Sequence, residues 1–229
     1  MRHVLLFSAA LSMAALLGCQ PTAEVAQPKP IQFEEEKSDP AKPFMKELKQ
    51  IAKDYTAWGR VDDEARWGPL SCRLPKPSVS RFSASKDADT HGQKLYSMFA
   101  KNREDYAFLK WQSMGQIIVK ESWVPEETTE VKPGDIDTKK TVNDGIRPRI
   151  DSQYYPYATK GDKVFKASKL AGLYIMMKVD PKSPDADEGW VYGTISADLK
   201  TVTASGKIES CMKCHQDAKS DRLFGLPAK

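Results

Sequence analysis

The chain has 229 residues and a formal net charge of +4, from 35 lysines and arginines and 31 aspartates and glutamates. This length fits one domain with tails, and the mild charge, with no basic cluster among aromatic residues, argues against nucleic-acid binding. The mean hydropathy of −0.55 excludes a polytopic membrane protein.

The chain begins with the pattern of a signal peptide over residues 1–18, a short basic start followed by an apolar run. The run is too short to span a bilayer comfortably. Its ending, Leu-Leu-Gly-Cys, resembles the lipobox of bacterial lipoproteins, where the cysteine is lipidated and becomes the new N-terminus. We therefore predict a lipid on Cys19 and a periplasm-facing place in a bacterial envelope, with the outer membrane favoured because Gln20 follows. The alternatives are an incidental cysteine after a signal peptide and an uncleaved anchor.

Residues 19–43 are rich in proline and charge and are predicted to be a flexible linker that leads to a folded domain at residues 44–229. The stretch "PFMKELKQIAKDYTAW" has apolar residues at helical spacing, which predicts an amphipathic helix. Residues 59–86 are rich in proline and serine and are predicted to be irregular.

Further along, β-branched or apolar runs predict strands at residues 94–100, 116–124, 170–180 and 189–196. We expect a short helix within residues 102–111, a long loop at residues 125–150 and another short helix near the C-terminal cysteines. Apolar runs on several strands with few helices favour an α+β fold, an antiparallel β-sheet with helices packed on it.

The stretch "ESCMKCHQDAKSDRLFGL" holds Cys211, Cys214 and His215 in a Cys-x-x-Cys-His run. This run is the attachment signature of c-type haem. The sulfurs on one helical turn can reach the vinyl groups of one porphyrin, and the adjacent histidine then lies under the iron as proximal ligand. Export fits this reading, because c-type haem is attached outside the cytoplasm. We therefore predict one covalent haem c, bound through Cys211 and Cys214 and ligated by His215.

Other assignments of these cysteines are weaker. A zinc site would need further ligands, and the chain offers only the distant His91 and Cys72. A thioredoxin-like pair would need a βαβ context, and a disulfide between Cys211 and Cys214 would leave His215 unexplained. Cys72 is interpreted as a buried free cysteine, with a reactive thiol or a dimer bridge as alternatives.

The ligand on the other side of the iron would decide the function. A strong sixth ligand gives an electron carrier, whereas an open site gives a gas binder or an enzyme. His91, in "DTHGQKLY", is a distal ligand, a distal hydrogen-bond donor or a surface residue before a strand. Met176 and Met177 lie on a predicted strand and are interpreted as core residues rather than ligands.

The arrangement of strands before a C-terminal haem motif resembles the cytochrome P-460 family, with its relative cytochrome c′-beta. The likeness is carried by "GQIIVKE", "AGLYIMMKVD", "GWVYG" and "CMKCHQDAKSDRLF", in which Asp221 and Phe224 match the family ending. It covers roughly residues 80–226. The resemblance implies a strongly bent antiparallel β-sheet with helices, a homodimer, and a haem that lies against the sheet.

The resemblance also implies roles for single residues. In the P-460 type, a lysine of the Val-Lys-Glu strand is bonded to the porphyrin, and Lys120 matches it. Such enzymes oxidise hydroxylamine, nitric oxide can bind the same iron, and electrons leave to a soluble cytochrome or another periplasmic acceptor. In the c′-beta type the cross-link is missing and the open distal face binds small gases. Gln93 aligns where family enzymes carry an arginine, with His91 nearby.

The alternation of a strand gives an independent view of Lys120. It places Ile118, Lys120 and Ser122 on one face of the strand and the intervening residues on the other. A lysine in an apolar strand is either exposed or salt-bridged, or it has a function. A desolvated lysine loses its proton more easily and becomes a nucleophile.

Overall fold

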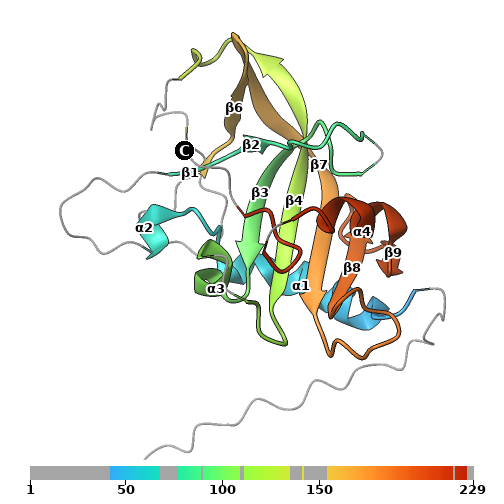
Figure 1. Ribbon diagram of the computed structural model, residues 1–229. Coiled ribbons are helices and arrows are strands. Elements are labelled where there is room, and N and C mark those ends of the chain that lie inside the picture. The colour runs from blue at the N-terminus through green and yellow to red at the C-terminus, as the bar shows by residue number, and fades with distance from the viewer. Residues whose placement is uncertain are drawn as a thin grey trace, which may run out of the picture. The chain divides into compact units, whose positions relative to one another are not determined.

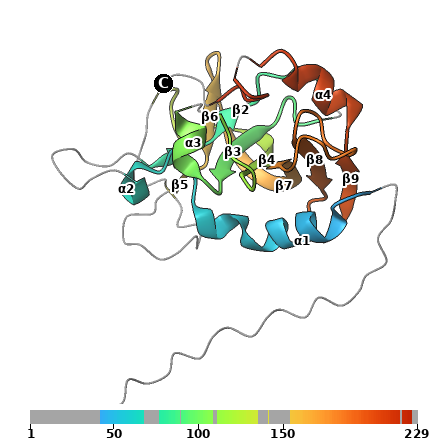
Figure 2. The same ribbon diagram turned by 60° about the horizontal axis from the view of Figure 1, so that its bottom comes forward.

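In the computed structural model, the residues that can be described are 42–67, 77–88, 90–108, 111–134, 141, 154–218 and 220–225. They form a mixed α/β structure that is mostly open antiparallel sheet with a few short helices (Figures 1 and 2). The predictions for Cys19, for most of the linker and for Cys72 lie outside the described residues. Within the described part of the chain, no helix is long and apolar enough to cross a membrane.

The helices are short and far apart in the chain: α1 (Met45–Asp54), η1 (Tyr55–Trp58), α2 (Glu64–Trp67), α3 (Arg103–Ala107) and α4 (Glu209–His215). The strands are β1 (Ser78–Val79), β2 (Arg81–Phe82), β3 (Leu95–Ala100), β4 (Ile117–Thr128), β5 (Tyr154–Tyr155), β6 (Tyr157–Lys160), β7 (Lys163–Lys178), β8 (Trp190–Ile195) and β9 (Val202–Gly206). The main sheet has the order β2-β3-β4-β7-β8-β9, with β6 also paired to β7, and all its pairs are antiparallel. Strands β1 and β5 form a separate parallel pair.

The central strands of the sheet are covered on both faces. In Figure 2, α1 runs along one face and α4 lies over the other. Ile117 and Val119 of β4 belong to the apolar cluster under α1, whereas Ile118 belongs to the cluster under α4. The alternation predicted for this strand is therefore confirmed, and it places Lys120 on the same face as α4.

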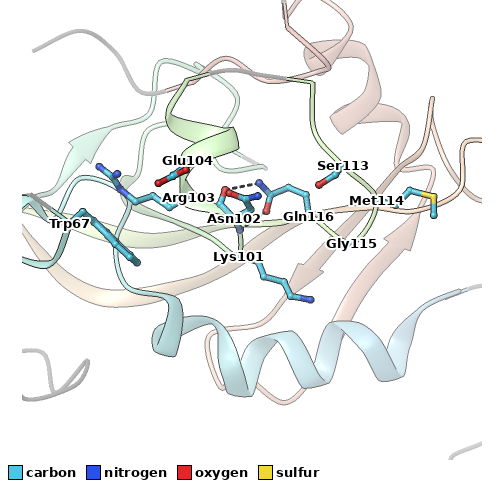
Figure 3. Close-up of a pocket in the computed structure, with 9 residues that line it drawn as sticks. All are labelled: Trp67, Lys101, Asn102, Arg103, Glu104, Ser113, Met114, Gly115 and Gln116. Carbon is cyan, nitrogen blue, oxygen red and sulfur yellow. Dashed lines mark hydrogen bonds between the residues drawn. The ribbon is translucent and has the colours of Figure 1, made fainter.

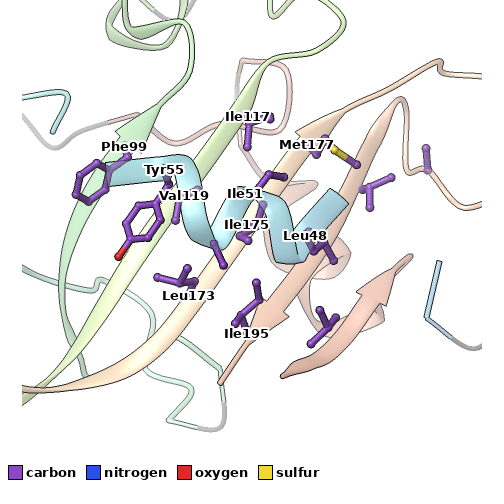
Figure 4. Packing of buried hydrophobic residues seen from close by; sticks show 14 residues of the cluster. Leu48, Ile51, Tyr55, Phe99, Ile117, Val119, Leu173, Ile175, Met177 and Ile195 are labelled. Atoms are coloured by element: carbon purple, nitrogen blue, oxygen red, sulfur yellow. The ribbon is translucent and has the colours of Figure 1, made fainter. Parts of the chain in front are cut away.

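Helix α1 is held on the sheet by the apolar face that its sequence spacing predicts. Leu48, Ile51 and Ala52 are buried and pack on the sheet (Figure 4). Leu48 lies directly over Gly193 of β8, where an added Cβ atom would come within 2.4 Å of Leu48 Cδ2. The glycine therefore leaves the space that lets the helix approach the sheet.

Several predicted elements are confirmed and others are corrected. The amphipathic helix, the strands near residues 94–100, 116–124, 170–180 and 189–196, and the short helices α3 and α4 are present. Residues 59–86 are not wholly irregular, because α2, β1 and β2 lie there. Strands of two residues are too short to show a period in the sequence. Strand β9 has no sequence prediction.

The loop predicted at residues 125–150 is wrong at its start, because β4 continues to Thr128 and pairs with the first part of β7. Its charges suggested a loop, yet Glu126 lies opposite Lys166 on the ladder between β4 and β7. Lys163 Nζ lies 2.8 Å from Glu127 Oε2, and Lys166 Nζ lies 3.2 Å from Glu130 Oε1. Such cross-strand pairs are compatible with an exposed strand. Register shifts between Ser122 and Pro125 are of the kind that locally bends a strand.

We expect Leu48→Ala to lower the free energy of unfolding by about 2–5 kcal/mol, because it removes a fully buried side chain and leaves a cavity above Gly193. Chemical denaturation followed by far-UV circular dichroism measures the change. Val124→Ala is the control: Val124 is 44% exposed, and its truncation should change the free energy by about 0.5 kcal/mol or less. Equal effects of the two variants would contradict the described packing of α1.

Candidate functional site

Helix α4 brings the three residues of the Cys-x-x-Cys-His motif to one side of the sheet. Cys211 and Cys214 are three positions apart and His215 is four beyond Cys211, so all three share a helix face. Cys211 packs against the apolar cluster on this face of the sheet, whereas Cys214 is exposed. Both thiols are free, so the disulfide considered from the sequence is not formed in this structure.

His215 is held in a single orientation by the segment that follows it. Its Nδ1 atom lies 2.6 Å from the backbone carbonyl oxygen of Arg222, and a carbonyl can only accept, so Nδ1 carries the hydrogen. The Nε2 atom is then left with its lone pair. The rings of Tyr192 and Phe224 lie 5.6 and 5.4 Å from the His215 ring.

Burial is the main cause that lowers the pKa of His215, and the Arg222 carbonyl partly opposes it. The ring is therefore neutral near pH 7. A neutral imidazole that donates through one nitrogen and keeps a lone pair on the other is the form in which histidine binds a metal. His215 fits the role of proximal haem ligand on this observation.

Lys120 lies across the same face of the sheet among uncharged partners. Its Nζ donates to Ser83 Oγ at 2.9 Å, lies 2.9 Å from His91 Nδ1 and sits 4.2 Å from the centre of the Tyr96 ring. Burial lowers the pKa of Lys120 to about 7, although the nearby Cys214 acts to raise it, and Lys94 lowers it further. Neither the exposed nor the salt-bridged alternative describes this lysine.

His91 is placed by the connection between β2 and β3, which folds back over the sheet. Tyr174 Oη donates to the carbonyl oxygen of Thr90 at 2.7 Å and pins the connection to β7. At Gly92 an added Cβ atom would lie 2.1 Å from Asp87 O, so the fold of this segment requires glycine there. The His91 ring lies 5.2 Å from the Tyr174 ring and 6.5 Å from the His215 ring. His91 is therefore part of the site and not a surface residue.

The contact between Lys120 and His91 bears on the two remaining roles of His91. When Lys120 is protonated its ammonium has donors only, so the contact then makes Nδ1 of His91 an acceptor and places the ring hydrogen on Nε2. A metal-bound histidine has the reverse arrangement, as His215 does. The contact thus favours a distal hydrogen-bond donor over a distal ligand. Burial, followed by the charge of Lys120, lowers the pKa of His91 to about 3, so the ring is neutral.

The structure brings together residues that are far apart in the sequence. Lys120, His91 and His215 meet on one face of the sheet, and Gln93 does not join them, because its side chain is exposed and donates to Lys86 O at 2.9 Å. Sequence reasoning missed Ser83 and Tyr174. Tyr174 is the β7 residue paired with Lys120, so the strand register would have identified it had the pairing been known.

A pocket of about 560 Å³ lies elsewhere, near α3 and the start of β4 (Figure 3). The described residues that line it are Trp67, Lys101, Asn102, Arg103, Glu104, Ser113, Met114, Gly115 and Gln116. They include no residue of the Cys-x-x-Cys-His motif and no histidine or cysteine. Gln116 Nε2 donates to the carbonyl oxygen of Asn102 at 2.8 Å across it. We assign no chemistry to this pocket.

Among the described residues, no group of three or more histidines, cysteines, aspartates and glutamates could hold a metal ion by itself. A haem iron does not require such a group, because the porphyrin supplies its equatorial ligands. No protein-family model matches the chain, and no curated protein matches it.

We expect the haem-free chain to gain stability as the pH rises from about 7 to about 8.5, because burial lowers the pKa of Lys120 to about 7 while the unfolded lysine stays protonated in this range. In this window the unfolded state binds more protons than the folded state, so the free energy of unfolding increases, by about 1 kcal/mol per pH unit. At higher pH the gain is opposed by Cys211 and buried tyrosines, whose pKa values burial raises. Lys120→Met should remove this rise, as measured by urea denaturation at several pH values. Lys163→Met, at an exposed position, should retain it. A rise unchanged in Lys120→Met would refute the assignment.

Proposed function

We propose that the protein is a c-type cytochrome of the P-460 type that binds one haem covalently. Cys211 and Cys214 would form the thioethers and His215 would be the proximal ligand. The observation that carries the proposal is the hydrogen bond from His215 Nδ1 to the Arg222 carbonyl at 2.6 Å, beside both thiols on one short helix. It leaves Nε2 available for iron, as outer contacts of metal-bound histidines do.

The sheet supports the finer assignment of the fold to the P-460 type. The family resemblance puts a lysine on the strand that faces the haem, and Lys120 occupies that face of β4, opposite the helix α1 side. Its reduced basicity is what a bond to the porphyrin ring would require of an amine. Lys120 remains the candidate for the cross-link.

We propose further that the protein oxidises hydroxylamine or nitric oxide and passes the electrons to a cytochrome. Haem would supply an iron that changes oxidation state and an open position for a small nitrogenous ligand. Oxidation of hydroxylamine to nitric oxide releases one proton with each electron. Lys120 Nζ, 2.9 Å from His91 Nδ1, has a pKa of about 7 and is the basic group on the distal side that could hold such a proton.

The envelope location belongs to the same proposal. A lipid on Cys19 would tether the domain to a membrane, facing the periplasm, where c-type haem is attached and a soluble cytochrome or another periplasmic acceptor can dock. A homodimer is the assembly that the family resemblance implies.

One observation favours a second function. The His91 and His215 rings are 6.5 Å apart, a separation at which His91 could reach an iron bound at His215. If its Nε2 ligated the iron, the protein would be an electron carrier, and if both the cross-link and the sixth ligand were missing, it would bind gases as cytochrome c′-beta does. The absorption spectrum separates these cases.

We expect covalent haem in the chain produced without Cys19 and with c-type haem maturation proteins. Haem should stay attached to the polypeptide in a denaturing gel, where haem staining detects it. The intact mass of the protein should show one haem per chain. The double substitution Cys211→Ala with Cys214→Ala should abolish attachment, because the thioether sulfurs are gone, whereas Cys72→Ala should preserve it. A wild-type chain that matures without haem would overturn the proposal.

For the distal side we expect a high-spin absorption spectrum. In the reduced protein, the Soret band should lie far to the red of that of ordinary c-type haem. Lys120→Ala should return the band to the ordinary position and abolish hydroxylamine-dependent reduction of an acceptor cytochrome. Lys101→Ala, at an exposed lysine, is the control and should change neither. Sharp low-spin bands that disappear in His91→Ala would instead establish the electron carrier. Unchanged spectrum and activity in Lys120→Ala would reject the P-460 assignment.

A further inference from the structure

The segment after the haem motif contains a strained turn. Leu223 N donates to the carbonyl oxygen of Ser220 at 2.8 Å, and the two residues between them, Asp221 and Arg222, have φ values of 44° and 64°. Positive φ at both central positions is the pattern of a type I′ turn, which normally selects glycine or asparagine. An arginine in this conformation costs free energy, so something outside the turn must hold it.

The side chain of Asp221 is buried, and both of its carboxylate oxygens have polar partners. Its Oδ1 lies 2.6 Å from Lys178 Nζ and accepts from Trp190 Nε1 at 3.1 Å, while Oδ2 accepts from the backbone N–H of Gln112 at 3.0 Å. Both members of the Lys178–Asp221 ion pair are only 3% exposed. Burying such a pair is a poor way to gain stability, because desolvation of both charges offsets their attraction. The pair is better explained by what it positions.

The side chain of Arg222, the other central residue of the turn, also anchors it. The Arg222 guanidinium lies 3.0 Å from Asp187 Oδ1 and 3.1 Å from Glu188 Oε1, just before β8. Asp187 in turn accepts from Tyr192 Oη at 3.1 Å. Contacts with the end of β7, with β8 and with the residues just before β8 therefore fix the peptide whose carbonyl oxygen lies 2.6 Å from His215 Nδ1.

We propose that Asp221 is a positioning residue for the proximal ligand. Its carboxylate, paired with Lys178, holds the turn that aims the Arg222 carbonyl at His215 and so keeps the ring hydrogen on Nδ1. This inference rests on the proposed haem function. A hydrogen bond at the outer nitrogen makes the imidazole more basic, which stabilises the oxidised iron and lowers the reduction potential.

The test compares the haem-loaded full chain with Asp221→Asn, which keeps the shape of the side chain and removes its charge. We expect the reduction potential to rise, as measured by spectroelectrochemistry. We also expect the Nδ1 hydrogen of His215 to exchange with deuterium about tenfold faster in proton NMR, because the turn opens more often. Lys178→Met should produce both changes, and the double variant should add little to either single variant.

Asp62→Asn is the matched control. Asp62 is also buried and accepts from a cation, a hydroxyl and a backbone N–H, from Arg81, Ser78 and Val79. It makes no contact with the turn, so its loss should lower the stability while leaving the potential and the exchange rate as in the wild type. If Asp221→Asn does not fold, Asp187→Asn releases the same turn through Arg222.

The outcomes separate this inference from the haem function itself. A loaded, folded Asp221→Asn protein with the wild-type potential and exchange rate would overturn the inference and leave the haem function standing. A wild-type chain that takes up no haem would overturn the haem function. In that case the tautomer of His215 in the haem-free full chain, read from its ring nitrogen shifts, decides whether Asp221 holds the ring, and a tautomer that Asp221→Asn leaves unchanged rejects it.

Discussion

The organisation of this protein depends on the two-residue alternation of β4 within a sheet that is covered on both faces. Glu121 faces α1, where it accepts from Tyr55 Oη at 2.7 Å and from Trp123 Nε1 at 3.0 Å. Lys120, one residue earlier, faces α4 and its Cys-x-x-Cys-His motif. A shift of the strand by one position would bury the lysine under α1 and the glutamate in the site. The register of β4 thus places both groups at once.

The adjacent side chains of Glu121 and Lys120 have opposite electrostatic surroundings. Glu121 has a cation nearby, with Arg60 Nη2 at 3.6 Å, and two hydrogen-bond donors that satisfy its carboxylate. Lys120 has a hydroxyl, a neutral imidazole and an aromatic ring, none of which offers a full negative charge. Tyr55, which follows α1, is therefore attached to the sheet by a satisfied polar contact within an apolar cluster, whereas the other face keeps a group that is poorly stabilised as an ion.

The sequence predicts best what is local and periodic. The apolar spacing of α1, the alternation at Lys120 and the grouping of Cys211, Cys214 and His215 follow from neighbouring residues. It does not predict the return of the connection that carries His91, or the turn that brings the Arg222 carbonyl to His215. Both depend on contacts between distant segments, such as that of Tyr174 with Thr90. The charged end of β4 was misread for the same reason, because its partner lysines lie on another strand.

The titratable groups of the site reduce the contribution that the α4 face of the sheet makes to folding stability, compared with the α1 face. Burial is the largest cause that lowers the pKa of Lys120, His91 and His215, and Lys120 also lowers that of both histidines. Bringing these groups together therefore opposes folding to the extent that any of them must give up a proton. Packing under α1 opposes this cost, since Leu48, Val119 and Leu173 are fully buried there. Perturbed groups of this kind gather where chemistry needs them, and here Lys120 and His91 lie on the same face of the sheet as Cys211, Cys214 and His215.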